Sequence, residues 1–332
     1  MTHRQDEVVV ITGASAGVGR ATARAFARQR ARIGLLARGM DGLEATKRDV
    51  EALGGTAIVV STDVADADQV EVAAEAVEHQ FGPIDIWINN AMTSVFAEFE
   101  DIEPDEYQRV TDVVYHGTVN GTRSALKRML PRDQGTIVLV GSALAYRGIP
   151  LQSAYCGAKH AIEGMFDSVR AELLHKKSRV HITMVQLPAL NTPQFGWVRS
   201  KLPQKAQPVP PIYQPEVAAE AIHYAAHQRR REIFVGAPSV ITIAGNKIAP
   251  GLADRYLAET GYNSQMRNER ENPDRRDNLW EPVPGDHGAH GVFDDRSHEY
   301  SPELWASKNR GWLSFAGAAL AGLIFTLVKS RD

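Results

Sequence analysis

Three polar side chains within SALAYRGIPLQSAYCGAKHA, residues 142–161, have the types and the spacing needed for proton transfer. Ser142 comes first, Tyr155 follows, and Lys159 stands four positions after the tyrosine. On a helix, Tyr155 and Lys159 would lie one turn apart on the same face. A tyrosine has an ordinary pKa of about 10, and a nearby ammonium favours the phenolate. The set therefore predicts Tyr155 as general acid or base at a carbonyl or alcohol oxygen that Ser142 holds, with Lys159 lowering the pKa of the phenol.

A glycine-rich segment, TGASAGVGR at residues 12–20, predicts the partner for this chemistry. It follows an apolar run and opens a helical segment, so free backbone N–H groups could bind the phosphates of a dinucleotide, which would supply the hydride. The alternative is a plain turn between a strand and a helix. The candidate cofactor-binding residues in this segment are Gly13, Ser15, Gly17, Val18 and Gly19.

The end of the second apolar run predicts NADP(H) rather than NAD(H) as the cofactor. NAD sites usually carry an acidic residue there for the ribose 2′-hydroxyl, whereas this chain has Ala37 followed by Arg38. A guanidinium suits a 2′-phosphate. Asp41 stands three residues before Glu44, so we interpret it as a helix cap. The alternative for Arg38 is a solvated surface charge.

The elements that must position these residues follow from an alternation of apolar and helical patterns over the first 235 residues. This alternation predicts an α/β fold, a doubly wound parallel sheet of about seven strands with helices on both faces. The predicted strands are 7–12, 31–37, 56–60, 84–88, 135–140, 180–186 and 232–236, and the predicted helices are 17–29, 42–53, 67–81, 105–129, 152–175 and 216–227.

Residues 188–215 interrupt the alternation with seven prolines. The segment follows the carboxyl end of a strand, where ligands bind in such sheets, and it predicts a loop that covers the substrate. The alternative is a surface loop stiffened by proline. Asp63 and Val64 follow the third strand, where a carboxylate could accept a hydrogen bond from an adenine amino group or cap the next helix.

Together, these motifs resemble the classical short-chain dehydrogenase/reductase (SDR) family over about residues 7–236. The matching segments are TGASAGVG, NNA at 89–91, Ser142 and YCGAK at 155–159. The resemblance implies a Rossmann-like sheet, a nicotinamide cofactor, a small-molecule carbonyl or alcohol substrate, and a homodimer or homotetramer. It also implies that the cofactor is bordered by Asp63, Asn90, Pro188 and Thr192, and that Tyr155 and Lys159 contact it.

Three positions depart from the family pattern. Val114 stands where the family usually carries an asparagine that helps to hold a proton-relay water. Met92 replaces the glycine after NNA, and Ala189 replaces the glycine after Pro188. The Ser–Tyr–Lys set remains, but Val114 keeps a second hypothesis open, a non-catalytic nucleotide-binding scaffold with the same fold. A third hypothesis is a membrane-tethered protein that binds a partner through its polar extension.

The carboxyl-terminal part of the chain predicts two further segments after a catalytic domain at 1–250. Residues 251–310 form a polar extension or linker, since the later part of this stretch has no helical or strand period. Residues 311–328 are uncharged, and 18 residues of helix span about 27 Å, so we predict a transmembrane helix there. The expected localisation is a membrane, with the catalytic domain cytoplasmic and an apolar or lipid-like substrate. The alternatives are a soluble cytoplasmic protein with this helix packed on its own surface, or an oligomer contact.

Composition excludes some classes of function. The 37 basic and 40 acidic residues are nearly balanced, which gives no sign of nucleic-acid binding. A single cysteine, Cys156, cannot form an internal disulfide. His287, His290 and His298 lie among aspartates but match no standard metal spacing, so no metal site is expected.

Overall fold

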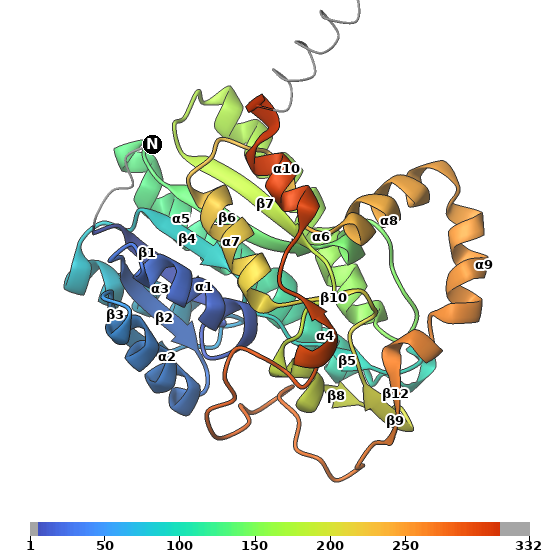
Figure 1. Ribbon diagram of the computed structural model, residues 1–332. Helices are drawn as coiled ribbons and strands as arrows, with labels where there is room; N and C mark the ends of the chain where they lie inside the picture. The colour runs from blue at the N-terminus through green and yellow to red at the C-terminus, as the bar shows by residue number, and fades with distance from the viewer. Residues whose placement is uncertain (1–5, 313–332) are drawn as a thin grey trace, which may run out of the picture.

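The computed structural model describes residues 6–312. Its centre is a seven-stranded sheet in the order β11-β7-β6-β4-β1-β2-β3, in which every neighbouring pair is parallel (Figure 1). The predicted doubly wound sheet is thereby confirmed. The strands are β1 (Val8–Thr12), β2 (Arg32–Ala37), β3 (Thr56–Ser61), β4 (Ile86–Asn89), β6 (Thr136–Ser142), β7 (His181–Leu187) and β11 (Glu232–Phe234).

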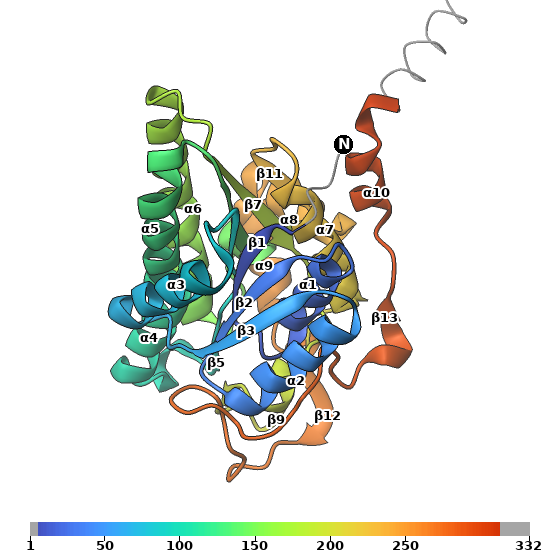
Figure 2. The same ribbon diagram turned by 90° about the vertical axis from the view of Figure 1, so that its left-hand side faces the viewer.

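Helices cover both faces of the sheet, as Figure 2 shows. Side chains alternate along each strand, so Val9 packs with one apolar cluster and Val10 with the other. One face carries α1 (Gly17–Ala27), α2 (Met40–Ala52) and α7 (Pro215–Ala226). The opposite face carries α3 (Ala67–Phe81), α4 (Pro104–Thr111), α5 (Gly117–Met129) and α6 (Ser153–His175).

The helix predicted over 105–129 is broken in the structure. A π-helical turn, Asp112–His116, separates α4 from α5. Such turns insert an extra residue into a helix and often lie at functional sites. Here the turn brings Val113 to the main cavity, while Val114 is fully buried in the apolar cluster beneath it.

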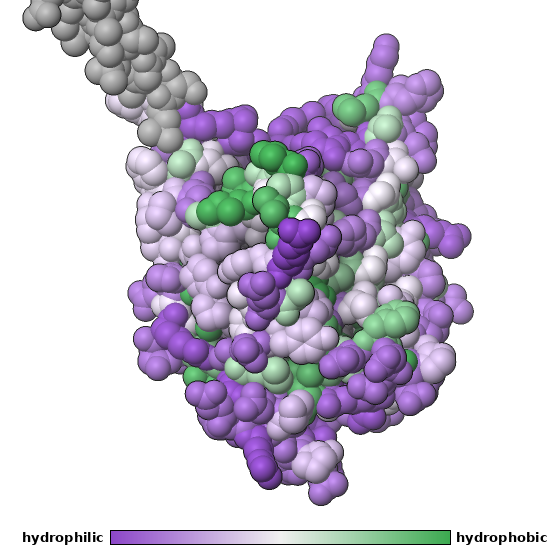
Figure 3. All heavy atoms as spheres, turned by 90° about the vertical axis from the view of Figure 1, so that its right-hand side faces the viewer, coloured by the Kyte–Doolittle hydropathy of each residue, from purple (hydrophilic) through white to green (hydrophobic). Residues whose placement is uncertain are grey.

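Two helices that the sequence analysis did not predict follow β11. They are α8 (Ala237–Ile248) and α9 (Pro250–Thr260), which project from the sheet in Figure 1. Their apolar side chains do not all face inward: Ile241, Ile248, Leu252 and Tyr256 are all exposed. Figure 3 shows apolar side chains gathered on the face of the molecule from which these helices project.

The polar extension predicted over 251–310 folds back onto the domain. Two of its short strands pair with the proline-rich loop after β7: β12 (Met266–Arg270) with β9 (Gln204–Ala206), and β13 (Ser297–His298) with β10 (Ile212–Tyr213). The extension ends in α10 (Pro302–Lys308), whose Leu304 is buried beside the sheet. A further short pair joins β5 (Val95–Phe96) and β8 (Arg199–Ser200).

The predicted transmembrane helix, 311–328, falls almost wholly outside the described residues, which end at 312. Between residues 6 and 312, no helix is both long and apolar enough to cross a membrane.

Candidate active site

A large cavity of 1040 Å³ opens at the carboxyl ends of the sheet strands. The strand order places β1 between β4 and β2. The connection from β1 leads to β2 on one side, and the connection from β4 leads to β6 on the other side. Ligands bind at this reversal of strand order in doubly wound sheets. Small-molecule pockets commonly measure about 300–1,000 Å³, so this cavity has room for a dinucleotide and a substrate. Its lining includes the glycine segment, the ends of β2, β3, β4 and β6, the start of α6, and the loop after β7.

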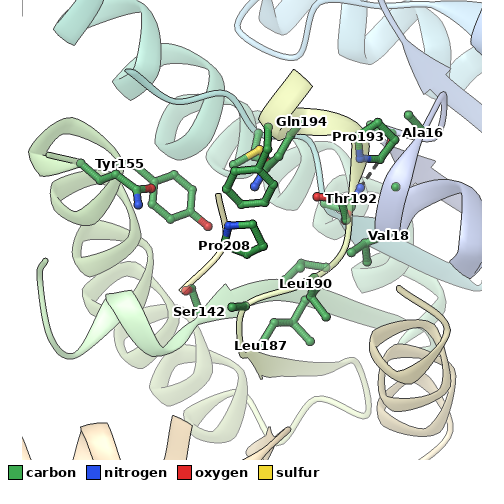
Figure 4. A pocket seen from close by; sticks show the side chains of 18 of the residues that line it. Ala16, Val18, Ser142, Tyr155, Leu187, Leu190, Thr192, Pro193, Gln194 and Pro208 are labelled. Carbon is green, nitrogen blue, oxygen red and sulfur yellow. Dashed lines mark hydrogen bonds between the residues drawn. The ribbon is translucent and has the colours of Figure 1, made fainter. Parts of the chain in front are cut away.

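Ser142, Tyr155 and Lys159 meet at one wall of this cavity. Ser142 is the last residue of β6, and Tyr155 lies in the first turn of α6. Figure 4 shows the side chains of Ser142 and Tyr155 directed into the same part of the cavity. The Lys159 ammonium lies 5.5 Å from the centre of the Tyr155 ring and donates a 2.6 Å hydrogen bond to the carbonyl of Val140. The spacing noticed in the sequence therefore corresponds to one cluster of side chains.

Burial controls the protonation of this cluster. It raises the pKa of Tyr155 well above its usual value, while a hydrogen bond with Ser142 acts in the opposite direction. Burial also lowers the pKa of Lys159 to about 8. The sequence predicted that Lys159 lowers the pKa of Tyr155, but in this structure desolvation of the phenol is the larger effect. At neutral pH Tyr155 is therefore a proton donor, and Lys159 still carries its charge.

The buried ammonium predicts a pH-dependent difference in stability between the wild type and Lys159→Met. Because burial lowers the pKa of Lys159 from 10.5 to about 8, the unfolded chain binds more protons than the folded chain between these pH values. The contribution of Lys159 to stability therefore rises with pH across this window. The free energy of unfolding of Lys159→Met relative to the wild type should fall there, by on the order of 1.4 kcal/mol per pH unit. Urea unfolding of both proteins at pH 7, 8, 9 and 10 measures the difference, and a constant difference would contradict the argument.

The glycine segment opens α1 at the edge of the cavity. Gly13 and Gly17 have φ angles of +67° and +53°, which favour glycine. A Cβ on Gly19 would lie 2.1 Å from the carbonyl oxygen of Gly13, so the backbone can make this close turn only with glycine there. Ser15 and Val18 line the cavity beside these glycines. The N-terminus of α1 thus borders the cavity, where an anion could bind, although the backbone N–H of Gly17 itself donates to the carbonyl of Gly288.

Gly19→Ala is expected to lower the free energy of unfolding by about 1–3 kcal/mol, because the added methyl group has no room. Gly164→Ala is the matched control. Gly164 lies inside α6, and a Cβ added there would meet no atom within 4 Å beyond its own helical turn, so alanine should be neutral or stabilise by about 0.5–1 kcal/mol. Urea unfolding of the two variants checks the pair, and equal stabilities would contradict the close turn.

Arg38 and Asp63 lie at the ends of β2 and β3, and both line the cavity. The guanidinium of Arg38 donates hydrogen bonds to backbone carbonyls of the extension, at 2.6 Å to Trp280, at 3.3 Å to Leu279, and also to Asn278. Burial, and next the neighbouring Arg109, lower the pKa of Arg38. Arg38 is therefore not a solvated surface charge.

Asp63 forms a 2.5 Å ion pair with Arg109 and accepts a hydrogen bond from the backbone of Ala65. Asp66, and not Asp63, caps α3. Val64 lines the cavity beside Asp63. The side chain at 63 is held in place at the cavity wall, so it remains a candidate adenine ligand.

The remaining cofactor candidates border the same cavity. Asn90 donates hydrogen bonds to the carbonyls of Thr12 at 2.9 Å and Gly13 at 3.3 Å, which ties β4 to the glycine segment. Pro188 and Thr192 line the cavity in the loop after β7. Thr192 is 8% exposed and approaches the position of a Cβ on Gly17 to 3.2 Å, so this loop closes against the N-terminus of α1.

The positions that depart from the family pattern differ in their surroundings. Met92 and Ala189 line the cavity, whereas Val114 does not. Val114 is fully buried, and its carbonyl accepts a 2.7 Å hydrogen bond from the hydroxyl of Thr118. The side chain at 114 has no amide to hold a water, so it cannot take the part in a proton relay that the family's asparagine takes.

Several further cavity residues lie far apart in the chain, and no local sequence pattern indicates them. Gln152 donates a 2.7 Å hydrogen bond to Gln265, and both line the cavity. Arg147 lines it as well and pairs with Asp254 of α9 at 2.6 Å. Apolar lining comes from both the proline-rich loop and the new helices, through Phe195, Trp197, Val209, Ile241, Tyr256 and Leu257.

The histidines of the extension have other partners. His290 contacts Glu216 and Asp294, and His287 packs edge-on against Trp197 at 4.4 Å between ring centres. Among residues 6–312, no group of three or more histidine, cysteine or acidic side chains could hold a metal ion. Cys156 is buried, which raises the pKa of its thiol to about 11.

Comparisons with known proteins agree with this fold. Residues 7–202 match the family model described as short chain dehydrogenase. The uncharacterized oxidoreductase YxnA of Bacillus subtilis is 34% identical over 85% of this chain and 80% of its own length. Dehydrogenase/reductase SDR family member 7B of Bos taurus is 29% identical over 80% of this chain and 83% of its own length.

Solved structures give the same result. An alcohol dehydrogenase from Thermococcus sibiricus, complexed with 5-hydroxy-NADP, superimposes with a TM-score of 0.60 and 26% identity over 69% of this chain and 95% of its own. A short chain dehydrogenase/reductase from Burkholderia phymatum, in complex with NAD, has a TM-score of 0.68 at 22% identity over 76% of this chain and 97% of its own, which compares the fold alone. With its family-model match and its seven-stranded parallel sheet, the chain belongs to the short-chain dehydrogenase/reductase family of oxidoreductases.

Proposed function

We propose that the protein is an NADP(H)-dependent oxidoreductase that interconverts a ketone or aldehyde with the corresponding alcohol. The observation that carries the proposal is the convergence of Ser142, Tyr155 and Lys159 on the cavity that the glycine segment also borders. Structural neighbours support a nicotinamide cofactor, since one neighbour is a complex with a modified NADP and another with NAD.

The residues of the cavity fit such a cofactor. The close turn at Gly19 lets the pyrophosphate approach the N-terminus of α1, and Arg38, which lines the cavity, would bind a 2′-phosphate. Asp63 and Val64 would hold the adenine, while Asn90, Pro188 and Thr192 would border the nicotinamide half. Lys159 would hold the nicotinamide ribose. When bound, the nicotinamide donates or accepts the hydride.

The roles of the three polar side chains follow from their protonation. In reduction, the protonated hydroxyl of Tyr155 donates its proton to the carbonyl oxygen as that oxygen gains negative charge. Ser142 donates a second hydrogen bond to the same oxygen and orients the carbonyl. The ammonium of Lys159, 5.5 Å from the ring centre, stabilises the phenolate that Tyr155 becomes. In oxidation, the phenolate takes the proton back from the alcohol.

The substrate half of the cavity favours an apolar molecule. Phe195 lines it together with Ile241 of α8 and Tyr256 of α9, both of which are also exposed at the surface. Polar contacts there come from Gln152, Gln265 and Arg147, so we infer a largely apolar ketone or alcohol with few polar groups.

Parallel titration of the full chain with NADPH and NADH, followed by cofactor fluorescence, tests the proposal. We expect binding of NADPH at least 10-fold tighter than that of NADH, and then reductase activity in a screen of apolar ketones. A preference for NADH would overturn the role of Arg38 but leave the dehydrogenase chemistry. Binding of neither would overturn the proposal.

One observation favours a second candidate, a nucleotide-binding protein without catalysis. Val114 is fully buried where the family carries its relay asparagine. Tight NADPH binding with no turnover on any carbonyl in the screen would support this candidate.

A further inference from the structure

A segment of the extension lies across the adenosine half of the cavity. We call residues 280–288 the cofactor strap. The chain between β12 and β13, orange to red in Figure 2, passes close to the ends of β2 and β3 and to α2. Pro282, Val283, Pro284, Gly285 and His287 of the strap line the cavity. The strap is therefore an outer wall of the proposed cofactor site.

The strap contacts the elements that would bind the cofactor phosphates. Asp41 accepts a 2.8 Å hydrogen bond from the backbone of Gly285, so it contacts the strap and does not cap α2, as the sequence analysis expected. At the glycine segment, the backbone of Gly17 donates a 3.1 Å hydrogen bond to the carbonyl of Gly288. These contacts join the strap to both sides of the adenosine half.

An ion pair fastens the strap to α1. Arg20 is 5% exposed and bridges Asp49 of α2, at 2.8 Å, and Asp286 of the strap. The arginine holds the pKa of Asp286 below its usual value. Without this partner, the carboxylate of Asp286 would repel cofactor phosphates, so Arg20 also makes the closed strap compatible with an anion.

The strap itself is not buried, whereas the residues that flank it are buried. None of residues 280–288 is buried, whereas the flanking Leu279 and Ala289 are 0% and 3% exposed. Gly285 and Gly288 have φ angles of +104° and +70°. Segments with few buried apolar contacts open at low free-energy cost, and the side chain of Asp286 is 45% exposed, so water can replace its ion-pair partner. Opening of the strap between the buried residues Leu279 and Ala289 therefore costs little free energy.

We propose that the cofactor strap closes over the adenosine and phosphate half of the bound nicotinamide cofactor and must lift each time the cofactor enters or leaves. The inference rests on the proposed function, since it assigns a cofactor to the cavity. Strap opening then limits cofactor exchange, and in many enzymes such release steps set kcat.

A reversible disulfide tests the strap directly. A Cβ on Gly39 would lie 3.2 Å from the Cβ of Pro282, near the separation of about 3.5–4.5 Å that a disulfide needs. Gly39 has φ −87°, which cysteine tolerates. The double variant Gly39→Cys, Pro282→Cys would lock the strap when oxidised and release it when reduced. The natural Cys156 is buried and has a raised pKa, so it does not compete for the new thiols.

Cofactor exchange is then measured by stopped-flow NADPH fluorescence on oxidised and reduced samples of the same protein. We expect the oxidised protein to take up NADPH at least 10-fold more slowly, and to release preloaded NADPH at least 10-fold more slowly, than the reduced protein. Equal exchange rates in the oxidised and reduced proteins would overturn the proposal that the strap must lift. Loss of equilibrium binding in the oxidised state, with no retention of preloaded cofactor, would also overturn it, because the strap would then occupy the cofactor's place.

A second variant tests the strap without a disulfide. Asp286→Asn removes the ion pair with Arg20 and should speed NADPH release several-fold, whereas Asp274→Asn, an exposed change in the same extension that lies off the cavity, should not. An unchanged rate of NADPH release in Asp286→Asn would contradict the proposal that this ion pair holds the strap closed. Failure of the wild type to bind NADPH or NADH would instead overturn the proposed function, and the strap with it.

Discussion

Tyr155→Phe is expected to lower kcat by about 10²–10⁴-fold while the affinity for NADPH changes by less than about threefold. The phenylalanine keeps the ring that packs beside Lys159, 5.5 Å from its ammonium, but has no proton to give to the carbonyl oxygen. Because burial holds Tyr155 protonated at neutral pH, no other form of this side chain supplies the acid. Steady-state kinetics on a ketone found in the screen, together with an NADPH titration, measure both effects.

Tyr146→Phe is the matched control. Tyr146 stands nine residues earlier, and its hydroxyl bonds to Glu232 outside the cavity lining. Removing that hydroxyl should leave kcat within about twofold, since surface and peripheral changes act through stability. If Tyr155→Phe retains wild-type turnover, the acid–base role assigned to Tyr155 is wrong, whatever the control shows.

The parts of the site that could be predicted are local in the sequence. Tyr155 and Lys159 are one helical turn apart, and Gly13 to Gly19 span the turn after β1 and the first residues of α1, so local spacing indicated both. The seven strands were predictable because a parallel sheet buried on both faces leaves continuous apolar runs.

The parts that could not be predicted depend on distant residues or on burial. Arg38 meets carbonyls about 240 positions away, and no periodicity in the polar extension marks that contact. Asp41 has the spacing of a helix cap, but Gly285 is its partner. The rise in the pKa of Tyr155 comes from desolvation, which depends on the whole cavity wall and not on the distance to Lys159 in the sequence.

Arg38→Gln is expected to weaken NADPH binding by about 10- to 100-fold and to leave NADH binding within about threefold. A hydrogen bond between a guanidinium and a phosphate contributes about 1.5–3 kcal/mol, and glutamine cannot supply the charge. NADH has no 2′-phosphate, so it does not depend on that charge. Fluorescence titrations with both cofactors give the ratio of the two dissociation constants, which is the quantity to compare with the wild type.

That ratio separates the two contacts that Arg38 makes. Its hydrogen bonds to the carbonyls of Asn278, Leu279 and Trp280 also steady the chain that leads into the cofactor strap. Loosening the strap alone would weaken the binding of both cofactors by similar factors, because the strap covers the adenosine and pyrophosphate that they share. Arg179→Gln, which breaks a 3.1 Å ion pair with Asp133 away from the cavity, should leave both affinities unchanged. An equal loss of affinity for NADPH and NADH in Arg38→Gln would assign Arg38 to the strap and not to the 2′-phosphate. A loss of affinity confined to NADPH would assign Arg38 to the phosphate. In that case added salt should reduce the preference for NADPH in the wild type but not in the variant.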